Sequence, residues 1–412
     1  MPRNFYFFFL FFALLSCSNP DINRNEETKL LEGEWRFTMS VQNELLPFNA
    51  KLNGLKSSKP SLSLYNADEE IVIDDLTITE DSLIAHLPFF NTALYLGLDS
   101  PDLLSGVWID HNRDNYCIPI TGEYSKPFRF TNAKSSLNIS DRYYVEFDSE
   151  DPYPAVLELT NSEGFLTGTF LTETGDYRYL QGNIMNSEIH LSTFDGSHAF
   201  LFRAKIDGDS LVNGRFLSGN HFSTDWRGAV DSVTTLRNPV SITESELGTP
   251  FDFELPNQDG QIVTWQDLNL DNKVVVIDIM GTWCPNCMDA SIALDELASN
   301  YDQDEITIVP VLFEYKDDLG WAQKAFSKYT EKLDTRRNFL FGGKASKKRA
   351  NEVFPMLSSV SSFPTLVFIG PDRQIAQIYT GFYGPGTGSH YDDFMKNTRK
   401  LLDSLVNERP SP

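Results

Sequence analysis

Cysteine is scarce in this chain of 412 residues, which contains only Cys17, Cys117, Cys284 and Cys287. Four are too few for a small fold held together by disulfides, so each cysteine needs its own explanation. The chain is also long enough to bury hydrophobic cores without such cross-links. A usual domain size of roughly 150 residues predicts two or three domains.

Basic residues are the second shortage. Lys and Arg total 34 against 58 Asp and Glu, which gives a formal net charge of −24. A protein this acidic lacks the positive surface that binds a nucleic-acid backbone or an anionic membrane, so we expect no nucleic-acid partner. The hydrophobic residues (41%) and aromatic residues (13%) are, by contrast, abundant enough for folded domains rather than a disordered chain.

Hydrophobic runs long enough to span a bilayer, about 20 residues, are also missing. The longest run is N-terminal, where a basic start precedes the apolar segment Phe5–Leu15. This pattern predicts a signal peptide over residues 1–17. Its end, LLSC, resembles the bacterial lipobox, in which the cysteine, here Cys17, is lipidated and becomes the first residue of the mature protein. A plain signal peptide with an incidental cysteine is the alternative.

Residues 18–30 are polar and predict a flexible tether. Together with the lipobox, they predict an exported protein that a lipid on Cys17 anchors to the inner or outer membrane. The remaining chain would then lie on the periplasmic side of the cell envelope.

Short alternating polar and apolar runs, separated by turn residues, fill residues 31–235. This pattern predicts an all-β domain, either an antiparallel sandwich or a barrel. Cys117 lies in one of the strand-like runs and is predicted to be a buried thiol. The stretches Asp81–Trp108 and Ser187–Phe216 resemble each other and suggest a duplicated sheet unit, although β meanders also resemble each other because turns recur.

The pattern changes after residues 236–247, which contain proline, show no clear period and are predicted to be a linker. Residues 248–408 alternate strand-like and helix-like segments, which predicts an α/β domain. Lys273–Ile279 is typical of a strand buried on both faces, and Leu319–Leu333 has the period of an amphipathic helix. A last helix is predicted to begin with a capping box at Ser389.

The sequence WCPNC follows the predicted buried strand and contains Cys284 and Cys287. Two cysteines three residues apart at the start of a helix can form a disulfide, and the helix N-terminus favours a thiolate at the first. Cys284 is therefore the predicted nucleophile and Cys287 the predicted resolving thiol. A zinc site is the rival interpretation, but zinc would need two more Cys or His ligands at suitable spacing, and none occurs. We expect no metal and no cofactor besides the Cys284–Cys287 disulfide.

From Leu247 to Val406 the sequence resembles the TlpA/ResA-like thiol–disulfide oxidoreductases of the bacterial envelope, which belong to the thioredoxin superfamily. The motifs that carry the resemblance are FDFELPNQDG, the strand followed by WCPNC, and SFPT before a later strand. The resemblance implies a thioredoxin-like fold for the C-terminal domain of a lipoprotein whose N-terminal domain is all-β.

The same resemblance implies roles for further residues. Asp278 would be the buried acid that takes a proton from Cys287 during resolution. Pro364 would be a cis-proline that faces the disulfide and leaves the backbone of Phe363 free to pair with an extended substrate. Trp283 would shield the reactive sulfur and line the docking surface.

The predicted function is therefore an envelope thiol–disulfide oxidoreductase, and the resemblance favours the reduction of protein disulfides. Its partners would be disulfide-bearing envelope proteins and a membrane electron donor. A peroxiredoxin is disfavoured, because the positions where it has Thr or Ser and Pro hold Gly281 and Ile277. Two alternatives stay open: a binding module or redox sensor whose β domain captures a partner, and a disulfide oxidase or isomerase.

Overall fold

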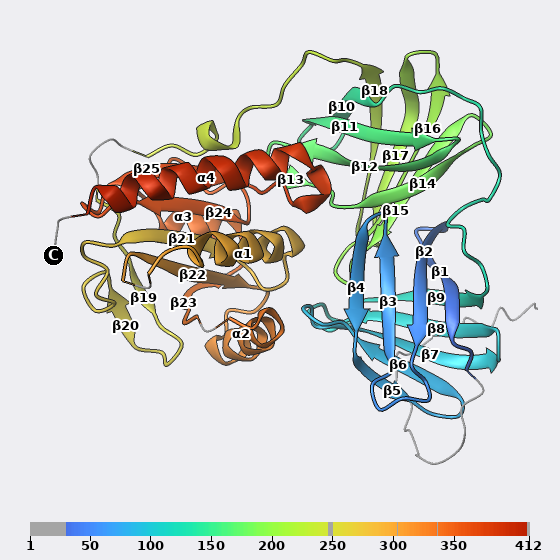
Figure 1. The fold of residues 1–412 in the computed structure, drawn as a ribbon, viewed down its shortest axis with the longest axis horizontal. Coiled ribbons are helices and arrows are strands. Elements are labelled where there is room, and N and C mark those ends of the chain that lie inside the picture. The colour runs from blue at the N-terminus through green and yellow to red at the C-terminus, as the bar shows by residue number, and fades with distance from the viewer. Residues whose placement is uncertain (1–29, 246–249, 303, 336, 410–412) are drawn as a thin grey trace, which may run out of the picture.

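The computed structural model describes residues 30–245, 250–302, 304–335 and 337–409. The predicted signal peptide and the lipidation site Cys17 lie outside these residues. The described residues form two nine-stranded antiparallel sheets, a two-stranded hairpin and a five-stranded mixed sheet. Figure 1 shows the two large sheets one above the other on one side and the α/β part on the other. None of the described helices is long and apolar enough to cross a membrane.

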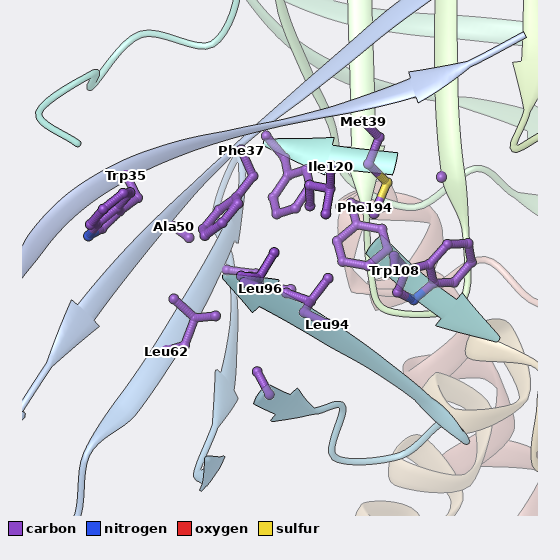
Figure 2. Packing of buried hydrophobic residues seen from close by; sticks show 14 of the residues in the cluster. Trp35, Phe37, Met39, Ala50, Leu62, Leu94, Leu96, Trp108, Ile120 and Phe194 are labelled. Atoms are coloured by element: carbon purple, nitrogen blue, oxygen red, sulfur yellow. The ribbon is translucent and has the colours of Figure 1, made fainter. Parts of the chain in front are cut away.

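The first sheet has the strand order β4-β3-β2-β1-β9-β8-β7-β6-β5, in which neighbours are consecutive in the chain except where β1 pairs with β9. Alternate side chains of β1, among them Trp35 and Phe37, are buried inside it, which explains the period-two pattern of the sequence. Figure 2 shows them packed with Leu94, Trp108 and other apolar side chains. The strands are β1 Gly33–Val41, β2 Glu44–Asn53, β3 Ser61–Asn66, β4 Glu69–Ile73, β5 Asp75–Ile78, β6 Ser82–His86, β7 Thr92–Ser100, β8 Leu103–Asp110 and β9 Cys117–Tyr124.

The second sheet closes on itself, because β10 pairs with β18 and β11 pairs with β12. It is therefore a barrel, with the short β13 paired to β12 as an appendage. Its interior is filled by aromatic rings; the centroids of Phe202 and Phe216, for example, are 4.3 Å apart. The strands are β10 Arg142–Phe147, β11 Tyr153–Ser162, β12 Phe165–Thr172, β13 Gly175–Asp176, β14 Leu180–Met185, β15 Glu188–Phe194, β16 Ala199–Asp207, β17 Ser210–Ser218 and β18 Phe222–Val230.

The two sheets share one strand order. The first contains the run β6-β7-β8-β9-β1-β2, and the barrel contains the run β15-β16-β17-β18-β10-β11 in the equivalent places. The similar stretches Asp81–Trp108 and Ser187–Phe216 fall on β6–β8 and on β15–β17. Each ends in a buried ring, Trp108 or Phe216, two residues after a glycine. The shared topology supports the duplication that the sequence suggests.

The C-terminal sheet has the order β23-β22-β21-β24-β25. β21, β22 and β23 run parallel, β24 pairs antiparallel with β21, and β25 pairs antiparallel with β24. Its central strand β21 is buried along its whole length, as predicted, and α2 spans the predicted residues. The elements are the hairpin β19 Glu254–Pro256 and β20 Ile262–Thr264, then β21 Val274–Met280, α1 Pro285–Ala298, β22 Ile306–Glu314, α2 Leu319–Leu333, β23 Leu340–Lys344, α3 Lys347–Val353, β24 Thr365–Ile369, β25 Ile375–Thr380 and α4 Ser389–Asn407, with short 3-10 turns η1 Pro239–Ser241 and η2 Pro385–Thr387. The predicted fold class is confirmed for both parts, the all-β part being barrel-like.

Two local predictions are wrong. Ser389 does not cap the last helix, because η2 leads directly into α4 and Gly388, at a φ of 58°, occupies the cap position without a side-chain hydrogen bond. Cys117 lies on a strand as predicted, but it begins β9 and is half-buried rather than buried. Both residues stand at the edge of an element, where sequence patterns define local surroundings least well.

The close pairing of β7 and β8 yields a stability prediction. A Cβ atom on Gly106 would lie 1.9 Å from the carbonyl oxygen of Tyr95, whereas one on Gly97 in the same sheet would lie 3.7 Å from its nearest neighbour. Gly106→Ala should therefore lower the free energy of unfolding by about 1–3 kcal/mol, the usual cost of overpacking. Gly97→Ala should change it by less than about 0.5 kcal/mol. Urea unfolding followed by circular dichroism would compare the two, and equal midpoints would contradict the prediction.

Candidate active site

The two cysteines of the WCPNC motif lie where β21 leads into α1. Cys284 is the N-cap residue of α1, and its sulfur accepts a hydrogen bond of 3.2 Å from the backbone nitrogen of Cys287. The two cysteines form a disulfide, with Cα atoms 5.2 Å apart. Cys284 is 6% exposed and Cys287 is fully buried. Cys284 is thus the more accessible of the two, as a nucleophile that precedes a resolving thiol must be.

The predicted docking residues lie beside this disulfide. The Phe363–Pro364 peptide bond is cis, and the carbonyl oxygen of Phe363 lies 3.6 Å from the sulfur of Cys284. The ring of Trp283 is 5.9 Å from that of Phe363, and its indole nitrogen donates to the carbonyl of Phe313. Trp283 and Phe363 remain partly exposed. The structure therefore brings together the four residues that the sequence assigns to attack and docking.

Asp278 is fully buried on β21, six residues before Cys284. Burial raises the pKa of its carboxyl to about 7, because the charged form is poorly solvated. One carboxyl oxygen accepts a hydrogen bond of 3.2 Å from the hydroxyl of Ser291, and the other has no hydrogen-bond partner among the described residues. A carboxyl in this state can hold or release a proton near neutral pH, which the role predicted for Asp278 requires.

A second buried carboxyl near the motif, Glu314 at the end of β22, is not among the predicted site residues. It accepts hydrogen bonds from the backbone nitrogen of Thr282 (2.9 Å) and from the Thr282 hydroxyl (3.1 Å). Burial raises its pKa to about 7. Glu314 thereby holds the residue that precedes Trp283. In the sequence, Glu314 is only an acidic residue at the end of an apolar strand. Many exposed acidic residues occur in the same position, so the sequence does not distinguish Glu314 from them.

Side chains of the β barrel form hydrogen bonds with three residues that flank Cys284. The hydroxyl of Ser197 donates to the carbonyl of Trp283 (3.1 Å), and the guanidinium of Arg178 donates to the carbonyl of Pro285 (3.2 Å). The side-chain amide of Asn286, between the two cysteines, donates to the carboxylate of Asp176 (3.1 Å). The barrel thus fixes the redox motif directly. The partners are about 90–110 residues apart in the sequence, so no local pattern indicates these contacts.

Arg178 is also the centre of a buried charge cluster. It forms ion pairs with Glu69 of β4 (2.5 Å), Asp195 (3.4 Å) and Asp289 of α1. All four side chains are less than 10% exposed. Burial raises the pKa of Asp289 to about 7 although Arg178 lowers it. The cluster contains residues from the first sheet, the barrel and the α/β domain, and therefore ties the three together.

Among the described residues, three cavities lie away from the disulfide, and clusters of metal-ligating side chains are absent. No group of three or more His, Cys, Asp or Glu side chains in this part of the chain could hold a metal ion. Cavities of about 710, 600 and 760 Å³ are lined by other residues than Cys284, Cys287, Trp283 and Phe363.

Comparison with known proteins agrees with the topology of the C-terminal part. The AhpC/TSA family matches residues 248–379. The C-terminal domain is thioredoxin-like. No curated protein sequence matches the chain.

Similar solved structures cover about two fifths of the chain. A DsbF homologue from Corynebacterium diphtheriae is 16% identical, with a TM-score of 0.31, over 42% of this chain and 99% of its own. A thiol-disulfide isomerase from Corynebacterium glutamicum is 14% identical, with a TM-score of 0.30, over 39% and 97%. A thiol-disulfide oxidoreductase from Bacteroides fragilis is 15% identical, with a TM-score of 0.27, over 36% and 99%.

The raised pKa of Asp278 predicts a pH dependence of stability. The folded state binds this proton more tightly than the unfolded state, whose pKa is near 3.8, so stability falls as the pH rises from 3.8 to about 7. Asp278→Asn should reduce this slope by up to about 1.4 kcal/mol per pH unit. Asp267→Asn is the control, because it removes an exposed carboxyl whose pKa is lowered by hydrogen bonds from Thr264. Urea titrations between pH 4 and 7 measure the slopes; a parallel profile for wild type and Asp278→Asn would refute the assignment.

The charge cluster predicts a large effect of one arginine. Arg178→Met leaves the buried carboxyls of Glu69, Asp195 and Asp289 without their cation, and should destabilise the protein by about 3–5 kcal/mol at pH 7. The loss should shrink at lower pH, where the Asp289 carboxyl, whose pKa is raised to about 7 by burial, takes up a proton. Arg227→Met removes an exposed pair with Glu146 and should cost less than about 1 kcal/mol. Thermal unfolding of both variants tests this, and similar losses would contradict a structural role of the cluster.

Proposed function

We propose that the protein is a thiol–disulfide oxidoreductase that acts through Cys284 and Cys287. The observation that carries the proposal is the disulfide at the N-terminus of α1, next to the carbonyl of Phe363. After reduction, the unpaired backbone N–H groups and the macrodipole of the helix favour a thiolate at Cys284. The sequence places neither Thr or Ser at position 281 nor Pro at 277, so we do not propose peroxidase activity.

The reaction follows from the positions of these groups. The Cys284 thiolate attacks one sulfur of the substrate disulfide, a mixed disulfide forms, and the substrate's other sulfur leaves as a thiolate that takes up a proton. Asp278 then accepts a proton from Cys287, whose thiolate attacks Cys284 and releases the second substrate thiol. The substrate gains two electrons, and the enzyme ends with the Cys284–Cys287 disulfide. An external dithiol must reduce this disulfide before the next cycle.

The TlpA/ResA-like motifs support a more specific role. In this proposal the enzyme reduces disulfides of envelope proteins on the periplasmic side of a membrane, a membrane electron donor recharges it, and a lipid on Cys17 anchors it. Trp283, Phe363 and Pro364 form the docking strip for the substrate. A reduction potential of about −270 mV for the Cys284–Cys287 pair would favour a reductase, whereas one of about −120 mV would favour an oxidase.

A second candidate function is a redox sensor whose β domain captures a partner. The hydrogen bonds from Ser197 to Trp283 and from Asn286 to Asp176 favour it, since a change at the disulfide would reach the barrel through them. A sensor should show redox-dependent partner binding but little catalytic turnover with excess disulfide and dithiol, whereas an oxidoreductase should turn over many times.

Substitution of the two cysteines tests the main proposal. Cys284→Ser should abolish disulfide reduction, because it removes the nucleophile, and Cys287→Ser should accumulate mixed disulfides, because it removes the resolving thiol. Cys117→Ser, at the start of β9, should retain wild-type activity. The measurement is dithiol-dependent disulfide reduction together with mass spectrometry of trapped adducts. Reduction that persists in Cys284→Ser would overturn the proposal.

A further inference from the structure

The surface that a substrate must reach is partly covered by the protein's own β sheets. Cys284 is only 6% exposed although it caps a helix that begins at the edge of its domain. Trp283, Pro285 and Asn286 are each hydrogen-bonded to the barrel. The open part of the site is therefore the strip beside the partly exposed rings of Trp283 and Phe363.

A loop of the first sheet forms one side of this cover. Phe90, between β6 and β7, is 3% exposed and belongs to the buried apolar cluster that contains Cys284 and Cys287. Phe89 packs against the same cluster. The ammonium group of Lys328 on α2 donates to the carbonyl of Leu87 (2.9 Å) and to that of Phe90 (3.1 Å). Lys328 thus fixes the loop over the apolar surroundings of the disulfide.

A segment of the barrel forms the other side. The hydroxyl of Ser362, in the loop before the cis-proline, donates to the carbonyl of Thr174 (2.8 Å). A Cβ atom on Gly381 would lie 2.5 Å from the carbonyl carbon of Thr174, so the two backbones are in direct contact. The short strand β13 continues from there to Asp176, which binds Asn286. The barrel is therefore in direct contact with the cis-proline loop.

We propose that these two contacts select the substrate: the enzyme reduces low-molecular-mass disulfides and disulfides in extended chain segments in preference to those on the surface of folded proteins. Phe90 and Lys328 are the specificity-determining residues. The inference rests on the proposed function and narrows its substrate class. Its physical basis is that a thin disulfide fits the strip beside Trp283 and Phe363, whereas a folded surface collides with the first sheet and the barrel before it reaches Cys284.

The experiment compares two substrates in the full-length protein. Enzyme that has been reduced and freed of reductant is mixed with glutathione disulfide or with native insulin, and a single turnover is followed. In this reaction the substrate disulfide gains the two electrons that leave the Cys284–Cys287 dithiol. Phe90→Ala, which removes the covering ring, should raise the rate with insulin by about tenfold, which corresponds to an activation free energy lower by about 1.4 kcal/mol. The rate with glutathione disulfide should rise by less than about twofold.

Lys328→Met provides an independent variant, because it releases the loop without removing a core ring and should shift the ratio of the two rates in the same direction. Phe165→Ala is the matched control. This exposed ring is at the first residue of β12, whereas the segment that contacts the cis-proline loop, Thr174–Asp176, follows the last residue of that strand. The reduction potential should be equal in all variants. An unchanged ratio in both Phe90→Ala and Lys328→Met overturns the selection, while a wild-type protein that reduces neither substrate overturns the proposed function itself.

Discussion

The arrangement of this protein depends on one buried cation. The guanidinium of Arg178 lies among the carboxyls of Glu69, Asp195 and Asp289, which come from three different parts of the fold. Each of these charges is costly to bury, and Arg178 is the cation that all three carboxyls share. A rotation of the α/β domain against the β sheets would leave buried charges unpaired. The relative placement of the domains is thus fixed electrostatically, rather than by a large apolar contact alone.

The same arginine also contacts the redox motif, because it donates to the carbonyl of Pro285 as well as to Asp289. The first turn of α1 is therefore shared between the thioredoxin-like domain and the barrel. In the motif itself, the side-chain amide of the partly buried Asn286 donates to the carboxylate of Asp176 in the barrel. The β domain is consequently part of the active-site structure, and the chemistry of Cys284 cannot be separated from the contacts that hold the barrel in place.

The sequence could predict what depends on local pattern. The apolar run of β21, the period of α2 and the spacing of Cys284 and Cys287 each occupy one short segment, and the structure contains all of them. Arg178 and Ser197 could not be predicted, because their partners lie about 90–110 residues away and only the folded chain brings them together. A buried arginine also looks like any surface arginine in a sequence, since burial of a charge is decided by the groups that surround it.

Two opposing effects act on the thiolate of Cys284. The N-terminus of α1 stabilises the negative charge. The carboxyls of Asp278, Asp289 and Glu314 each have a pKa raised to about 7 by burial, and each disfavours a neighbouring thiolate once it ionises. As the pH rises through 7, these carboxyls ionise and the surroundings of the cysteines become more negative. An added negative charge disfavours a thiolate, so the ionised carboxyls would oppose the effect of the helix N-terminus on Cys284.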